Sequence, residues 1–278
     1  MRRLGHGMAE RGRGAGTASL RERARGLWTR CGGCGLEVER AVLETALGVC
    51  PHCGYHHRMG VGDRVAYLFD PGSFLADTDE VRTSDPISFQ EGAYLREALS
   101  LTGEAMLFGE AAVLGKPCVA ALMDFSVFGG SMGIAVGELF RRACARSVER
   151  GYPLLAVACS GGARVQEGTP ALLQMARVMF ALAQLSEARL PFISLLCDPT
   201  SGGVAASFAT AADVILAEPG ALICFSGPRV VEQTLGIKPR PDFSRAESLL
   251  ERGLVDMVVP RRRQREVIGG LLAFFERR

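Results

Sequence analysis

The segment "AVACSGGARVQEG", residues 156–168, decides the fold class of this chain. A short apolar run ends at Ser160, two glycines follow, and a helix-like pattern begins after them. Gly161 and Gly162 permit a tight turn between a strand and a helix. Residues 158–162 also imitate the G-x-S-x-G turn that presents a nucleophilic serine in α/β-hydrolases. The segment therefore encodes a nucleophile, a phosphate-binding loop or a turn of bare backbone.

The distribution of histidine argues against the nucleophile. A hydrolase turn of this kind needs its histidine downstream of the serine. All four histidines lie at or before residue 57, so residues 58–278 supply no imidazole base for Ser160. The G-x-x-x-x-G-K-[ST] pattern of a phosphate-binding loop is also missing. The remaining interpretation is a strand, a turn of exposed backbone and a helix.

The same strand–glycine–helix pattern occurs three times. "PCVAALMDFSVF" is followed by "GGSMG" and a helix over 134–150, and "PLLAVACS" by Gly-Gly and a helix over 169–188. "PFISLLCDP" is followed by "TSGG" and a helix of small residues, "VAASFATAA". Spacing of three and four over 169–188 predicts one buried apolar face. That face comprises Leu172, Leu173, Met175, Ala176, Met179, Phe180 and Ala183.

The C-terminal third continues the alternation of strands and helices. "DVILAEPGALICFSGP" predicts short strands around a Pro-Gly turn, and "FSRAESLLERG" predicts a helix closed by Gly253. "LVDMVVP" predicts one further strand. Together these patterns indicate an α/β fold in which helices cover a mixed or parallel sheet.

The paired glycines suggest a use beyond turning the chain. Backbone N–H groups that point at one position beside a helix N-terminus can stabilise an oxyanion. Gly161 and Gly162 are the candidate donors. The alternative is that each glycine pair only permits close packing.

Four of the nine cysteines form a metal-binding pattern. Cys31 and Cys34, and Cys50 and Cys53, are two C-x2-C pairs separated by fifteen residues. This spacing is typical of a structural zinc site in which four thiolates complete a tetrahedron. The other five (Cys118, Cys144, Cys159, Cys197, Cys224) lie in apolar or small-residue settings, and we expect them to be buried.

Composition limits the remaining classes of protein. Hydrophobic residues make up 48% of the chain, yet no apolar run reaches about 18 residues, so no membrane span is expected. No secretory signal is evident, which indicates a cytoplasmic protein. Residues 1–26 hold seven arginines and two glutamates, a composition typical of a disordered tail.

Taken together, several segments resemble one known family. "WTRCGGCG", "VCPHCGYHHRM", "GGSMGIAVGE", "SGGARVQEG", "DPTSGGVAASFA" and "ALICFSGPRVVEQT" are similar to the beta subunit of bacterial acetyl-coenzyme A (CoA) carboxylase carboxyltransferase. The resemblance extends from about residue 28 to about residue 259. It joins a four-cysteine ribbon to several glycine motifs in a fixed order.

The resemblance implies a fold and a domain organisation. The expected fold is a crotonase-like superhelix of ββα units preceded by a small zinc ribbon. The expected divisions are an Arg-rich tail (1–27), the ribbon (28–57), a helical lead-in (58–104) and the carboxyltransferase domain (105–278).

The resemblance also implies a reaction and partners. The carboxyl group of carboxybiotin would pass to acetyl-CoA, giving malonyl-CoA for fatty acid synthesis. An alpha subunit would complete a heterotetramer of two alpha and two beta chains. Biotin would arrive on a biotin carboxyl carrier protein that a biotin carboxylase charges.

Site residues follow from the matched motifs. Gly161 and Gly162 match the motif for the oxyanion donors, and an enolate intermediate requires such donors. The single structural zinc ion would be bound by Cys31, Cys34, Cys50 and Cys53. The acyl-CoA pocket would be shaped by Gly129, Gly130, Gly133, Gly202 and Gly203, with Arg229 as a candidate contact to CoA phosphates. Arg164 and Glu167 are either structural or catalytic.

Two segments depart from the family pattern. Residues 82–104 lack the family's usual lysines, and the segment "GIKPRPDFSRAE" is similarly altered. A specialised paralogue that acts on another acyl-CoA, or that decarboxylates a malonyl thioester, is therefore a second hypothesis. A nucleic-acid-binding zinc ribbon is a third, but Glu37, Glu39 and Glu44 make this ribbon a poor phosphate-binding surface.

Overall fold

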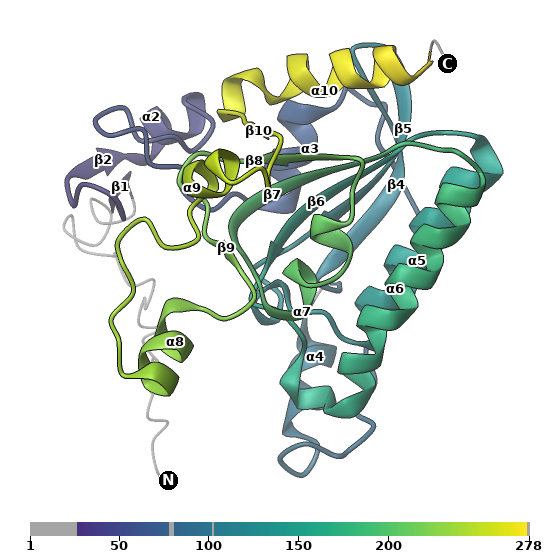
Figure 1. Cartoon of the computed structure of the whole chain (residues 1–278), viewed down its shortest axis with the longest axis horizontal. Coiled ribbons are helices and arrows are strands. Elements are labelled where there is room, and N and C mark those ends of the chain that lie inside the picture. The colour runs from purple at the N-terminus through teal and green to yellow at the C-terminus, as the bar shows by residue number, and fades with distance from the viewer. Residues whose placement is uncertain (1–26, 78–80, 102, 277–278) are drawn as a thin grey trace, which may run out of the picture.

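This computed structural model describes residues 27–77, 81–101 and 103–276. Most of the predicted Arg-rich tail therefore lies outside the described residues. A mixed eight-stranded sheet forms the centre of the molecule (Figure 1). In spatial order its strands are β10 (Met257–Val258), β8 (Val214–Ala217), β7 (Phe192–Ser201), β6 (Leu154–Ser160), β5 (Lys116–Met123), β4 (Met106–Val113) and β3 (Leu75–Ala76), with β9 (Ile223–Cys224) paired to β7.

Strand direction divides the sheet into two parts. β3, β4 and β5 are antiparallel, whereas β5, β6, β7, β8 and β10 run parallel to one another. The predicted mixed sheet is therefore confirmed. The parallel part brings the carboxyl ends of β5, β6 and β7 to the same edge.

Helices cover both faces of the sheet, because successive side chains of each strand point to opposite faces. On β6, Leu154, Ala156 and Ala158 join the core under α5 (Ile134–Arg150) and α6 (Thr169–Glu187). Leu155 and Val157 join the core under α3 (Val61–Leu68) and α10 (Arg261–Glu276). Both faces of β6 are therefore apolar, as its continuous apolar sequence requires.

The remaining helices have four to eight residues, except α10, which has 16. They are α2 (Arg40–Thr45), α3 (Val61–Leu68), α4 (Ala93–Ser100), α7 (Gly202–Ala205), α8 (Pro228–Leu235), α9 (Ala246–Glu251) and α10 (Arg261–Glu276). Single 3-10 turns cover Phe128–Gly130, Val165–Glu167 and Phe208–Thr210. None of the helices in the described part of the chain combines the length and apolar composition that a membrane crossing needs.

Two sequence predictions about helices need correction. The helix expected over "VAASFATAA" is broken, since α7 ends at Ala205 and only a 3-10 turn follows. On α6 the predicted apolar face points outward, and Leu173 and Phe180 are 62% and 75% exposed. The buried face carries smaller and polar residues (Ala171, Gln174, Val178, Ala181, Leu182, Leu185).

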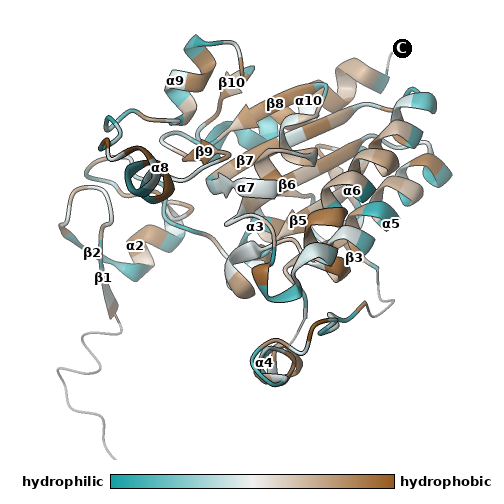
Figure 2. Cartoon of the chain, turned by 60° about the horizontal axis from the view of Figure 1, so that its bottom comes forward, coloured by the Kyte–Doolittle hydropathy of each residue, from teal (hydrophilic) through white to brown (hydrophobic). Residues whose placement is uncertain are grey.

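Close packing of α6 on α5 explains this reversal. A Cβ atom on Gly137 of α5 would lie 2.2 Å from Oε1 of Gln174. Such an approach requires short side chains on the buried side of α6 and leaves its large apolar side chains on the surface. Figure 2 shows these two helices side by side on one face of the apolar sheet.

The ribbon has a small core of its own. β1 (Trp28–Arg30) pairs with β2 (Glu37–Glu39), and α2 follows directly. Cys31, Val38, Leu43 and Cys50 form a separate buried cluster. This separate core supports the predicted division at residue 57, which stays a prediction.

Candidate active site and metal centre

Three glycine turns meet at the carboxyl edge of the parallel strands, and we call residues 129–133, 161–162 and 202–203 the glycine edge. The Gly161 N–H donates to the Gly129 carbonyl at 2.9 Å, and the Met132 N–H donates to the Gly162 carbonyl at 2.7 Å. A Cβ atom placed on Gly162 would lie 3.1 Å from the Gly202 Cα atom. The three glycine motifs of the sequence therefore form one continuous backbone surface.

Glycine is required at several of these positions. Gly162 has φ +118° and Gly202 has φ +58°, a region that side chains disfavour. A Cβ atom on Gly130 would lie 2.1 Å from the Cys159 carbonyl oxygen. Close backbone packing, the alternative left open by the sequence, therefore accounts for part of the motif.

The proposed oxyanion donors already have acceptors within the chain. The Gly161 N–H reaches the Gly129 carbonyl, and the Gly162 N–H donates to Ser160 Oγ at 3.0 Å. A thioester oxygen would have to replace these acceptors. Donation by Gly161 and Gly162 to an enolate therefore stays a prediction.

Ser160 holds the turn together. Its side chain is fully buried, and its hydroxyl donates to the Gly130 carbonyl at 2.6 Å while accepting the Gly162 N–H. A nucleophile needs access to substrate and an adjacent base. Ser160 has neither, which agrees with the argument from histidine.

Glu167 fixes the start of α5 behind the glycine edge. Its buried carboxylate accepts the Ile134 N–H at 2.6 Å, the Thr83 hydroxyl at 2.6 Å and the Tyr94 hydroxyl at 2.7 Å. A Cβ atom on Gly133 would lie 2.3 Å from Oε1 of Glu167. Gly133 therefore makes room for this carboxylate at the helix N-terminus, where negative charge is stabilised.

Arg164 is equally buried and joins the same network. Its guanidinium donates to both Glu104 oxygens, at 2.6 and 3.1 Å, and to the Ser131 carbonyl at 2.9 Å. Burial opposes its charge, but the hydrogen bonds and charge of Glu104 raise the pKa of Arg164 above its ordinary value. Of the two roles left open by the sequence, the geometry favours a structural role for Arg164 and Glu167.

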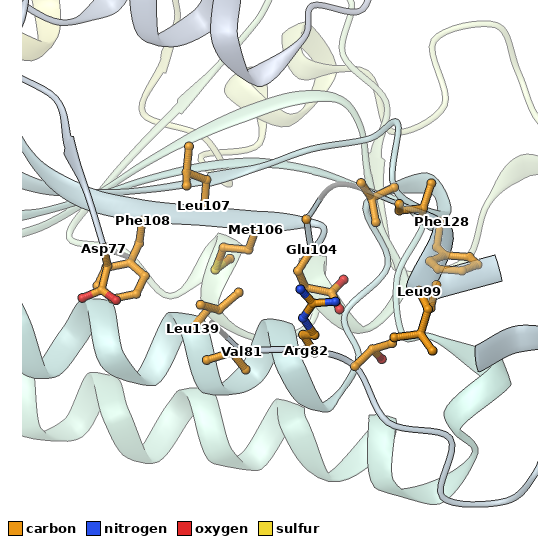
Figure 3. Close-up of a pocket in the computed structure, with 15 residues that line it drawn as sticks. Asp77, Val81, Arg82, Leu99, Glu104, Met106, Leu107, Phe108, Phe128 and Leu139 are labelled. Carbon is orange, nitrogen blue, oxygen red and sulfur yellow. The ribbon is translucent and has the colours of Figure 1, made fainter. Parts of the chain in front are cut away.

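A pocket of about 330 Å³ lies beside this network (Figure 3). Met106 projects into it from β4 and Leu139 from α5, while Glu104 and Phe128 line the side nearest the glycine edge. The predicted CoA contact Arg229 lies elsewhere, on α8, which has no buried residues and stands apart from the sheet (Figure 1). The exposed Arg229 side chain makes no hydrogen bond to the described residues of the glycine edge.

The four predicted metal ligands converge. The Sγ atoms of Cys31, Cys34, Cys50 and Cys53 lie within 4.8 Å of one another. The Cys31–Cys53 and Cys34–Cys50 sulfur pairs are 3.6 and 4.0 Å apart. A tetrahedral zinc ion with bonds of about 2.3 Å requires sulfur separations of roughly 3.8 Å, so this donor set fits zinc.

At one of the four cysteines, Cys31, local electrostatics favours the thiolate. Burial disfavours the charged form of Cys31, but backbone N–H groups of Cys34 and Gly33 outweigh it and lower the pKa of Cys31 to about 6. At Cys53 of the same cluster the Tyr55 backbone N–H lowers the pKa, but desolvation and the neighbouring thiols outweigh it and raise the pKa to about 12. Burial likewise raises the pKa of Cys159 to about 12. Burial therefore disfavours the thiolate of Cys159, next to the glycine edge.

A charged cluster that the sequence did not reveal joins the ribbon to the sheet. The guanidinium of Arg261 donates to the Leu47 and His57 carbonyls of the ribbon, at 2.9 and 2.6 Å. It also donates to both oxygens of Glu218 at 2.8 Å. Glu218 accepts a further hydrogen bond from Arg64 at 3.0 Å. "RRRQRE" resembles an ordinary charged surface, and nothing in it marks Arg261 as buried.

Comparison with known proteins agrees with this architecture. Residues 57–244 match the carboxyl transferase domain family. The chain is 46% identical to the acetyl-CoA carboxylase carboxyl transferase subunit beta of Thermus thermophilus, over 86% of each chain. It is 49% identical to the beta/alpha protein of Salinispora arenicola but spans only 45% of that protein's length.

Solved structures show the same fold. A transcarboxylase 12S structure superposes with a TM-score of 0.67 at 25% identity, covering 78% of this chain and 42% of the other. A Pseudomonas malonate decarboxylase hetero-dimer gives 0.61 at 23% identity, covering 79% and 86%. The fold and the glycine edge therefore define a carboxyl transferase of the crotonase-like class. Within this class, the chain belongs to the family of acetyl-CoA carboxylase carboxyl transferase beta subunits.

Proposed function

We propose that this chain binds acetyl-CoA and supplies the enolate-stabilising half of a biotin-dependent carboxyltransferase. The carboxyl group comes from carboxybiotin on a biotin carboxyl carrier protein charged by a biotin carboxylase, and the product is malonyl-CoA. The glycine edge supports this proposal, because three backbone turns meet there, and backbone N–H donors are what the developing enolate oxygen of an acyl thioester requires. In this mechanism Gly161 and Gly162 face the thioester oxygen.

The chain's own residues have three tasks in this reaction. Ser160 and Glu167 anchor the turns through the Gly130 carbonyl and the Ile134 N–H, while the Gly161 and Gly162 N–H groups exchange their internal acceptors for the enolate oxygen. Glycines 129, 130, 133, 202 and 203 keep the surface free of side chains. The four cysteines bind one structural zinc ion, which takes no part in the chemistry because four thiolates leave no open position.

The second half of the site belongs to an alpha subunit. The Salinispora relatives carry both names, beta and alpha, in one chain of about twice this length. The exposed apolar side chains of α6, including Leu172, Leu173 and Phe180, offer a surface for such a partner. We therefore assign activity to a complex of two alpha and two beta chains.

The reverse reaction tests this proposal. Zinc-loaded protein, with and without the alpha subunit, is given malonyl-CoA and a free biotin derivative, and thioester loss is followed beside other carboxyacyl-CoA esters. Biotin-dependent loss that requires alpha is the expected result. Loss without alpha or biotin would instead identify a decarboxylase, and no loss with the complex assembled would reject the assignment.

A further inference from the structure

The turn between β5 and α5 has an unusual backbone conformation. Phe128, Gly129 and Gly130 have φ values of +46°, +62° and +64°, so three consecutive residues lie in the left-handed region. Glycine adopts this region freely, but the Cβ atom of Phe128 makes it unfavourable there. Backbone strain of this kind clusters at active sites and switch regions. We call residues 128–130 the Phe128 turn.

The Phe128 turn blocks one of the two proposed oxyanion donors. Its Gly129 carbonyl accepts the Gly161 N–H at 2.9 Å, although Gly161 itself is exposed. A Cβ atom on Gly129 would have one neighbour within 4 Å, the Phe125 ring at 3.8 Å, whereas one on Gly130 would lie 2.1 Å from the Cys159 carbonyl oxygen. Gly130 is therefore fixed by close packing, and the steric freedom of the turn lies at Gly129.

The side chain of Phe128 sets the position of the turn. Its ring centre lies 5.2 Å from that of Tyr94 and 5.1 Å from the guanidinium carbon of Arg164. Both neighbours are buried, and the Arg164 guanidinium donates to the Tyr94 hydroxyl at 3.2 Å. Two fixed side chains thus hold the ring, and with it the Gly129 carbonyl, in the observed position.

The pocket beside this network gives the Phe128 ring a second place to lie. Phe128 and Leu99 line one end of it, while Met106 and Leu139 project into it from β4 and α5 (Figure 3). Its volume of about 330 Å³ is larger than the roughly 150 Å³ that accommodates benzene in a protein core. The ring therefore has space to leave its contacts with Tyr94 and Arg164.

Two opposing contributions keep the observed turn and a released turn close in free energy. Moving the Gly129 carbonyl breaks its bond to Gly161 and the bond from the Gly130 N–H to the Val127 carbonyl, at 2.9 Å. Each such bond has a modest net contribution, because water or substrate replaces the partner. Relaxing Phe128 to negative φ regains an amount comparable with about one or two of these bonds. A turn balanced in this way responds to a ligand that binds only one of its forms.

We propose that Phe128 is a positioning residue that controls whether the Gly161 N–H is available to the thioester. In the observed form the Gly129 carbonyl holds this donor. When the thioester oxygen binds, the Gly129 peptide turns away, Phe128 passes to negative φ and its ring moves into the pocket. This proposal rests on the proposed function, in which Gly161 donates to the enolate oxygen.

Nuclear magnetic resonance of the zinc-loaded full chain observes this donor directly. The sequence contains three Ser-Gly pairs, so ¹³C-carbonyl serine and ¹⁵N-glycine introduced by cell-free synthesis select the amides of Gly161, Gly202 and Gly227. Ser201→Ala and Ser226→Ala each remove one signal and thereby assign the third to Gly161. We expect malonyl-CoA to shift the wild-type Gly161 signal and to leave that of Gly227, at the start of α8, unchanged.

Two variants separate the backbone strain from the ring. Phe128→Ala removes the ring and keeps the unfavourable φ, whereas Phe128→Gly removes both. We therefore expect the Gly161 amide to exchange with solvent about five-fold or more faster in Phe128→Ala than in Phe128→Gly. A turn that had only become flexible would show the reverse order, because glycine is the more flexible residue.

The same comparison divides KM from kcat in the complex with the alpha subunit. Neither variant has the ring, so their kcat values should agree once the turn is released. KM for malonyl-CoA should be lower in Phe128→Ala by the factor measured in the exchange experiment, because a larger fraction of the protein is ready to bind. Leu114, before the start of β5, also has a left-handed φ, +52°. Leu114→Ala and Leu114→Gly are therefore the matched control pair and should not differ in either measurement.

The outcomes separate this inference from the proposed function. Equal exchange of Gly161 in the two Phe128 variants, or faster exchange in Phe128→Gly, would overturn the inference even if the complex turns over malonyl-CoA. Binding of malonyl-CoA to the wild type without a shift of Gly161 would also overturn it, and this result needs no variant to fold. The expected order of exchange, without turnover by the assembled complex, would support the control of Gly161 by Phe128 and reject the function.

Discussion

Replacing Glu218 by glutamine should loosen the attachment of the ribbon to the sheet. Glu218 is 1% exposed and is the shared carboxylate of Arg64 and Arg261, which are 4% and 2% exposed. Glutamine keeps the size of the side chain but removes its charge. Two buried guanidinium groups would then lack a counter-charge.

The magnitude follows from burial and from the pKa of Glu218. Removing one partner of a buried ion pair costs about 3–5 kcal/mol. Burial alone raises the pKa of Glu218, but the charges of Arg64 and Arg261 outweigh it and lower this pKa from 4.5 to about 2. A shift of that size corresponds to roughly 3 kcal/mol, in agreement with the first estimate.

The pKa shift also gives a pH dependence with a definite sign. Because the folded pKa of Glu218 lies below its unfolded value, this stabilisation is complete above about pH 4.5. It is lost as the pH falls toward about 2. The wild type should therefore lose stability over this window, and Glu218→Gln should lose less over the same window.

Thermal unfolding of the zinc-loaded chain at pH 7 measures the effect. A loss of about 3 kcal/mol lowers the Tm of a protein of this size by roughly 6–12 °C. Glu276→Gln is the matched control, since Glu276 pairs with Lys116 on the surface and is worth about 1 kcal/mol or less. Limited proteolysis should cut the ribbon of Glu218→Gln earlier. Equal Tm values for the two variants would refute the argument from burial.

Three further outcomes are expected. Cys34→Ser should reduce bound zinc, measured by metal analysis, and expose the ribbon to proteolysis, because the tetrahedron loses one thiolate; full zinc occupancy would contradict this. Gly133→Ala should lower Tm and carboxyltransferase activity, because the new Cβ atom would lie 2.3 Å from Oε1 of Glu167. Gly270→Ala is the control: its Cβ atom would have no neighbour within 4 Å, so Tm should not fall. Ser160→Ala should lower Tm, because the Gly162 N–H loses its acceptor. Because Ser160 is not a nucleophile, mass spectrometry of the wild-type protein should detect no acyl adduct.

Local sequence patterns were sufficient to predict most of the fold. Continuous apolar runs marked β6 and β7 as strands covered on both faces, and the helices over 134–150 and 169–188 match α5 and α6 closely. The paired C-x2-C motifs predicted the sulfur cluster, because the spacing itself encodes the geometry.

Long-range contacts could not be predicted in this way. The contact between Arg261 and the Leu47 carbonyl joins residues 214 positions apart, and an arginine gives no sequence signal of burial. The prediction that the apolar face of α6 is buried was wrong for a related reason. Helical spacing identifies a stripe but does not show whether the stripe meets the chain's own core or a partner.

The position of this stripe bears on why the chain needs a partner. α6 begins at Thr169, one 3-10 turn after Gly161 and Gly162, and its exposed apolar side chains start at that end with Leu172 and Leu173. In the proposed complex, a subunit seated there would close over the glycine edge, whose own residues 129–133, 161–162 and 202–203 offer backbone groups and no ionisable side chain. An edge of this composition can stabilise charge on a bound thioester but cannot deliver a carboxyl group to it. In the proposed complex, an alpha subunit on the surface of α6 would bring the second half of the reaction beside the glycine edge.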